Sequence, residues 1–118
     1  HATLYAIRGF DRVILIMGGD NKGLTFESLR DEVRKRVKKI IAMGKSAKLI
    51  YDTFSDIVEV VLAKDMFDAV FKAYEASDGE PVLLSPACAS FDMFRDYLHR
   101  SEVFRMAIRN LKESKTPL

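Results

Sequence analysis

The chain has 118 residues, which is enough for one domain with a core and too few for two. Hydrophobic residues make up 48% of it and charged residues 31%, a composition typical of a globular protein. The net charge of +2 is too small to favour nucleic-acid binding, and no apolar run is long enough to cross a bilayer.

Cysteine and histidine usage excludes two further classes of protein. A single cysteine, Cys88, rules out an internal disulfide and fits a reducing compartment such as the cytoplasm. The sequence contains no Cys/His cluster of the kind that binds structural zinc, so we expect no metal site in the chain. The chain begins at His1 rather than Met and has no signal-peptide pattern, which we interpret as a fragment of a longer protein.

The first half of the chain alternates predicted strands with predicted helices. The apolar run 12–17 ends in two glycines, as is typical of a strand buried on both faces. A helix is expected from about Thr25, and the basic stretch 34–39 is predicted to form its solvated face. Residues 40–43 predict a second strand, and residues 48–54 predict a helix packed on the sheet.

The second half continues the same alternation. Residues 58–63 predict a third strand, and Asp65 opens a helix with a predicted inward stripe. The residues of that stripe are Phe67, Val70, Phe71 and Tyr74. A fourth strand is predicted at 81–84, and a long helix from Phe94 to Leu111 precedes a tail over 112–118 that we expect to fray.

This pattern predicts the α/β fold class, with a single three-layer, Rossmann-like domain over residues 1–118. Right-handed crossovers between successive strands give a mostly parallel sheet with helices on both faces. Ligands of such sheets bind at the carboxyl ends of the strands. Two loops of unusual composition begin at that edge, one after the first predicted strand and one after the fourth.

The first loop reads GGDNKG and consists of Gly18, Gly19, Asp20, Asn21, Lys22 and Gly23. Its glycines and asparagine permit positive φ and let backbone N–H groups approach a ligand closely. Lys22 adds a mobile positive charge suited to a carboxylate or phosphate. The spacing matches neither a P-loop nor a dinucleotide fingerprint. A tight loop with a solvated lysine is the alternative and, for this loop alone, the commoner case.

The second loop, SPACAS, runs from Ser85 to Ser90. Pro86 ends the preceding strand because it cannot donate a hydrogen bond to a neighbouring strand. Ser90 is suited to cap the next helix, whose free N–H groups and dipole attract an anion. Alternatively, Ser90 only caps that helix. Cys88 lies between two alanines and is expected to be a packing residue rather than a nucleophile. The residues alone therefore predict an anion site between the two loops.

The residues of the two loops resemble those of a known family. GGDNKG after a buried strand, LLSPACASFDMF at 83–94, and then Tyr97 closely resemble the C-terminal domain of the Mur ligases, in the branch that adds D-glutamate. The resemblance extends over nearly the whole chain, residues 1–111. It implies that the chain is the C-terminal, amino-acid-binding domain of a three-domain, ATP-dependent ligase of cytoplasmic peptidoglycan synthesis.

The resemblance also implies partners and residue roles. In the family, the carboxylate of UDP-N-acetylmuramoyl-L-alanine is phosphorylated at the expense of ATP, and the amine of D-glutamate attacks the acyl phosphate. By motif, Lys22 binds one carboxylate of D-glutamate, and Ser90, Phe91 and Tyr97 hold the other, with Ser85 and the GGDNKG residues in support. ATP and Mg²⁺ are bound mainly by upstream domains. We therefore expect a monomer with no catalytic residue in these 118 residues, which are inactive alone.

Two alternatives remain open. The sister folylpolyglutamate synthases share this architecture and also add glutamate, although the SPACAS sequence argues against them. A non-catalytic, anion-binding α/β module is the other alternative. Specificity for D- or L-glutamate would decide the first, and the presence of an upstream P-loop in the complete gene would decide the second.

Overall fold

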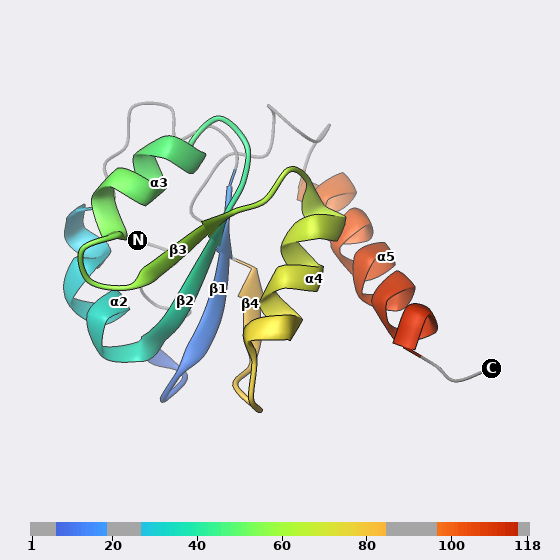
Figure 1. Cartoon of the computed structure of the whole chain (residues 1–118), viewed down its shortest axis with the longest axis horizontal. Helices are drawn as coiled ribbons and strands as arrows, with labels where there is room; N and C mark the ends of the chain where they lie inside the picture. The colour runs from blue at the N-terminus through green and yellow to red at the C-terminus, as the bar shows by residue number, and fades with distance from the viewer. Residues whose placement is uncertain (1–6, 19–26, 85–96, 116–118) are drawn as a thin grey trace.

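A four-stranded sheet, with every neighbouring pair of strands parallel, forms the centre of the fold (Figure 1). The computed structural model describes residues 7–18, 27–84 and 97–115, with the backbone alone at 97–101 and 113–115. The strands are β1 (Val13–Met17), β2 (Val37–Ala42), β3 (Glu59–Leu62) and β4 (Val82–Leu84), in the order β3-β2-β1-β4. The predicted α/β class and parallel sheet are confirmed.

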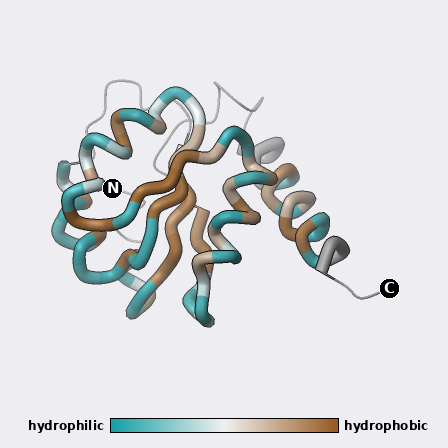
Figure 2. The backbone as a smooth tube through the Cα atoms, in the orientation of Figure 1, coloured by the Kyte–Doolittle hydropathy of each residue, from teal (hydrophilic) through white to brown (hydrophobic). Residues whose placement is uncertain are grey.

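Helices cover both faces of the sheet, as the sequence predicted. One face carries the 3-10 turn η1 (Glu27–Leu29), α2 (Arg30–Arg36) and α3 (Ala47–Phe54). The other carries α4 (Met66–Ala76) and α5 (Tyr97–Lys115). Alternate residues of β1 enter the two cores, and all five are fully buried. Figure 2 shows the apolar colour concentrated along the strands.

The start of β2 differs from the prediction. The strand begins at Val37 rather than Ile40, because Val37 pairs with Val13 and takes an extended conformation with φ −109° and ψ 123°. The stretch 34–39 is therefore not one solvated helix face, since Lys38 and Lys39 belong to the strand.

The inward face of α4 also differs. Of the predicted stripe only Val70 is buried, while Phe67, Phe71 and Tyr74 are 40%, 50% and 38% exposed. The residues that pack on the sheet with Val70 are Met66, Ala69 and Ala73. Small side chains let a helix approach a sheet closely, and this orientation of α4 turns the bulky aromatic residues outward.

The closing helix packs through apolar residues against the same core as α4. Ala107 is buried, and four apolar neighbours on α5 are partly buried against that core. These are Val103, Phe104, Ile108 and Leu111. The helix continues to Lys115, into the segment 112–118 that the sequence suggested would fray.

Candidate functional site

The strand order places the origins of the two unusual loops on neighbouring strands. The chain runs outward from β1 through β2 to β3, then returns across the sheet to form β4 on the other side of β1. Ile16 of β1 pairs with Leu84 of β4, so the carboxyl ends of these strands are adjacent. This reversal of direction is a topological switch point, where ligands of open α/β sheets bind. Residues 19–26 and 85–96 both start there.

Most of the predicted binding residues lie outside the described residues. These are Gly19, Asp20, Asn21, Lys22, Gly23, Ser85, Ser90 and Phe91. Tyr97 is the first residue of α5, and its backbone alone is described. Only Gly18 is described in full. The structure therefore establishes where the loops are attached, and the roles of their side chains stay predictions.

Gly18 is held against the end of the neighbouring strand. The Met43 N–H donates a hydrogen bond to the Met17 carbonyl oxygen at 3.0 Å. A Cβ at position 18 would lie 2.6 Å from Met43 Cγ and 2.9 Å from the Met43 carbonyl oxygen. Gly18 is thus required by the close approach of two strand ends, a packing role that differs from the ligand-approach role predicted for it.

The turn after β2 belongs to the same edge of the sheet and was also missed. Gly44 has a φ of 76°, and its carbonyl oxygen accepts a hydrogen bond from the Ala47 N–H at 3.2 Å. Ser46 is 3% exposed and immediately precedes α3. A glycine, a lysine and a serine between a strand and a helix are the sequence signal that could have identified this turn.

Hydrogen bonds and an ion pair hold the corner between β3 and α4. Asp65 accepts a hydrogen bond from the Asp68 N–H at 2.8 Å and caps α4. Asp68 accepts the Lys64 N–H at 3.0 Å and pairs with Lys72 at 3.0 Å, and these contacts hold its pKa below the usual value. Lys72 also donates to the Leu62 carbonyl oxygen at 2.9 Å. These groups are therefore used to fix the helix to the sheet.

Comparison with known proteins finds relatives of this chain among named ligases. No protein-family model matches it. UDP-N-acetylmuramoylalanine--D-glutamate ligase of Methylobacillus flagellatus is 42% identical over 117 residues, which are 97% of this chain and 26% of that protein. The enzymes of that name from Aquifex aeolicus and Aromatoleum aromaticum are each 46% identical, over 89% and 95% of this chain. The chain is a homologue of these D-glutamate ligases. The predicted resemblance is confirmed.

This ligase homologue spans about a quarter of the length of those relatives. The matched region covers almost all of the chain, so it includes both loops and the sheet and is not limited to a short motif. Within the described part of the chain, no helix is long and apolar enough to cross a membrane.

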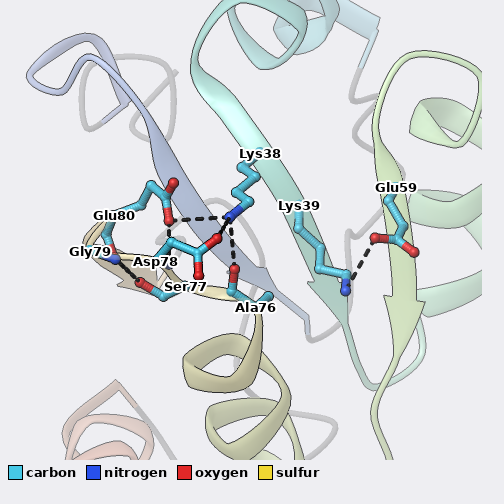
Figure 3. A network of polar contacts seen from close by, with 8 residues as sticks. All are labelled: Lys38, Lys39, Glu59, Ala76, Ser77, Asp78, Gly79 and Glu80. Atoms are coloured by element: carbon cyan, nitrogen blue, oxygen red, sulfur yellow. Dashed lines mark hydrogen bonds and ion pairs between the residues drawn. The ribbon is translucent and has the colours of Figure 1, made fainter.

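A polar network lies at the opposite edge of the sheet, where the strands begin (Figure 3). Lys38 Nζ donates to the Ala76 carbonyl oxygen at 3.0 Å and contacts Asp78 Oδ2 at 2.9 Å and Glu80 Oε1 at 3.4 Å. Glu80 also accepts the Asp78 N–H at 2.7 Å. These contacts hold the turn that leads into β4, far from the switch point, and so indicate a structural role.

Replacing Glu80 with glutamine should lower the melting temperature at pH 7. It should also reduce the fall in melting temperature that the parent chain shows as the pH is lowered. The Asp78 N–H and nearby Lys38 hold the pKa of Glu80 below the usual value. The stabilisation from the carboxylate is thus present above about pH 4.3 and is lost as the pH falls through the lowered pKa. Melting curves from pH 7 to 3 should show Glu80→Gln and the parent chain converging at the acid end.

Glu59→Gln is the matched control for this experiment. Glu59 pairs with Lys39 at 3.1 Å, but its side chain is 69% exposed, and exposed ion pairs contribute little to stability. The melting temperature of Glu59→Gln should stay close to that of the parent chain. Parallel curves for Glu80→Gln and the parent at every pH would contradict the role given to Glu80.

Proposed function

We propose that the chain is the C-terminal, amino-acid-binding domain of a three-domain ligase that adds D-glutamate to UDP-N-acetylmuramoyl-L-alanine. The observation that carries this proposal is the attachment of both motif-bearing loops at the switch point between β1 and β4. The names of relatives 42–46% identical to the chain support the same reaction.

The proposed reaction needs this domain for orientation rather than for bond-making. The terminal carboxylate of the UDP-linked L-alanine is first converted to an acyl phosphate at the expense of ATP, with release of ADP. The amine of D-glutamate then attacks the acyl carbon, the carbon–oxygen bond to phosphate breaks, and inorganic phosphate leaves. The amine supplies the electron pair, so no residue of this chain acts as a nucleophile.

D-Glutamate carries two carboxylates, and the two loops offer a different kind of partner to each. Lys22 provides a mobile point charge for one carboxylate. Ser90 and the N–H groups that follow it, with Phe91 and Tyr97, provide a directional site for the other. Two anchors fix the position and the direction of the amine, and such orientation can contribute several kcal/mol toward the barrier.

ATP and Mg²⁺ are assigned to the remainder of the ligase. Among residues 7–18, 27–84 and 102–112, no group of three His, Cys, Asp or Glu side chains is placed to hold a metal ion. Because the ATP site is proposed to lie in other domains, the 118-residue chain alone is expected to bind D-glutamate without turnover. We place the complete ligase in the cytoplasm, where its nucleotide substrates are made, as a monomer.

Phosphate release by the complete ligase tests this function. The enzyme is given ATP, Mg²⁺ and UDP-N-acetylmuramoyl-L-alanine, with D-glutamate, L-glutamate, L-lysine or diaminopimelate in turn. We expect release with D-glutamate alone, and none from the 118-residue chain under the same conditions. Release with L-glutamate on a folate acceptor would overturn the assignment in favour of a folylpolyglutamate synthase, and turnover by the short chain would contradict the division of roles.

A further inference from the structure

Ser46 has a buried hydroxyl that none of the described residues satisfies. Its side chain is 3% exposed, and its Oγ has no hydrogen-bond partner within the described part of the chain. It occupies the N-cap position of α3, yet it makes no capping bond to the helix. Buried polar atoms in native proteins nearly always have a partner, and an exception often marks the place of a ligand, ion or water.

The helix that follows Ser46 adds positive potential and the N–H groups of its first turn, of which the Ala47 N–H already bonds to the Gly44 carbonyl oxygen. The first N–H groups of an α-helix have no acceptor inside the helix, and the dipole is positive at that end. The first turn of α3 contains no acidic residue, whereas α2 and α4 both carry acidic residues in theirs. Lys45 and Lys48 are exposed on either side of Ser46, and Lys48 pairs with Asp52 at 3.4 Å. The helix dipole and the absence of an acidic residue in the first turn of α3 favour an anion over a cation.

The position of this turn connects it with the proposed D-glutamate site. Ser46 follows the carboxyl end of β2, two residues after Gly44. Met43 is hydrogen-bonded to Met17 and lies against Gly18, the residue from which the chain enters the 19–26 segment. The N-terminus of α3 is thus at the edge of the sheet where the 19–26 segment begins, and it follows the neighbouring strand.

We propose that Ser46 and the first turn of α3 form a site for a phosphoryl group, separate from the sites for the D-glutamate carboxylates. A tetrahedral phosphoryl group has enough oxygens to accept from the Ser46 hydroxyl and from the helix N–H groups together. The enclosure of Oγ favours a small terminal oxyanion over a bulky ligand. The identity of the phosphoryl group, as part of the acyl phosphate or as the phosphate released from it, rests on the proposed function.

The test is a titration of the ¹⁵N-labelled 118-residue chain with inorganic phosphate, at constant ionic strength maintained with sodium chloride. We expect saturable shifts of the backbone amides from Ala47 to Leu49. Ser46→Ala should weaken the affinity about tenfold, the usual loss for a hydrogen bond to a charged group. Ser55→Ala, at the exposed C-cap of the same helix, should leave the affinity unchanged. Non-saturable shifts spread over surface lysines would overturn the proposal.

Thermal melting separates a ligand site from a structural hydroxyl. If Oγ has no partner in the unliganded chain, Ser46→Ala should leave the melting temperature unchanged or raise it. Phosphate should then stabilise the parent chain and Ser55→Ala, but not Ser46→Ala. A lower melting temperature for unliganded Ser46→Ala, with no response of the parent to phosphate, would show that the hydroxyl serves the fold and would overturn the site.

Two further ligands identify the source of the phosphoryl group and separate this site from the proposed function. Tighter binding of acetyl phosphate than of phosphate would support an acyl phosphate as the ligand, and the reverse would support the released product. D-Glutamate, titrated alone, should not shift the backbone amides of Ala47 to Leu49. Added to the phosphate-bound chain, it should not displace phosphate. Phosphate binding without D-glutamate binding would leave this site standing and count against the proposed function.

Discussion

Replacing Lys22 with alanine in the complete ligase should raise the KM for D-glutamate about 10- to 100-fold and change the KM for ATP little. A contact between an ammonium group and a carboxylate contributes about 1.5–3 kcal/mol, and each 1.4 kcal/mol corresponds to a tenfold change. Lys22 belongs to the 19–26 segment, which begins after β1 at the switch point, and ATP is assigned to other domains. Steady-state kinetics with each substrate varied in turn measures the two KM values separately.

Lys35→Ala provides the matched lysine control. Lys35 is exposed near the end of α2, where the chain turns back toward the amino ends of the strands. Its replacement should leave both KM values close to those of the parent enzyme. Equal increases in the KM for D-glutamate and for ATP in Lys22→Ala would remove the specific role given to this side chain, as would no increase in either.

Replacing Gly18 with alanine should lower the free energy of unfolding by about 1–3 kcal/mol, the usual cost of forcing extra volume into a packed site. The new Cβ would lie 2.6 Å from Met43 Cγ and 2.9 Å from the Met43 carbonyl oxygen, so a strand end has to move. Because the 19–26 segment starts at this residue, D-glutamate binding should weaken as well. Urea denaturation of the 118-residue chain measures the stability.

A double-mutant cycle with Met43→Ala identifies the cause of that loss. Removing Met43 Cγ relieves one of the two close contacts, so the cost of Gly18→Ala should fall in part in the double variant. Gly79→Ala is the control, since its φ of 114° makes alanine strained although nothing lies within 4 Å. Its cost should not depend on Met43. A Gly18→Ala cost that is equally independent of Met43 would contradict the packing explanation.

The alternation of elements and the places along the chain where the two unusual loops begin could be predicted from the sequence because both depend on local chemistry. A continuous apolar run such as 12–17 suits a strand covered on both faces, and β1 is buried along its whole length. Lys22 and Ser90 were identified by residue type and by their place after predicted strands. The roles of these two side chains remain predictions, because they lie outside the described residues.

Tertiary structure alone decided the features that depend on distant partners. Val37 joins β2 because it pairs with Val13, and α4 packs through Ala69 and Ala73 because small residues allow close approach to the sheet. The strand order brings β4 beside β1 and so creates the switch point at which both loops begin. Pairing and packing of this kind join residues far apart in the chain, whose contact energies are not encoded in any local pattern of residue types.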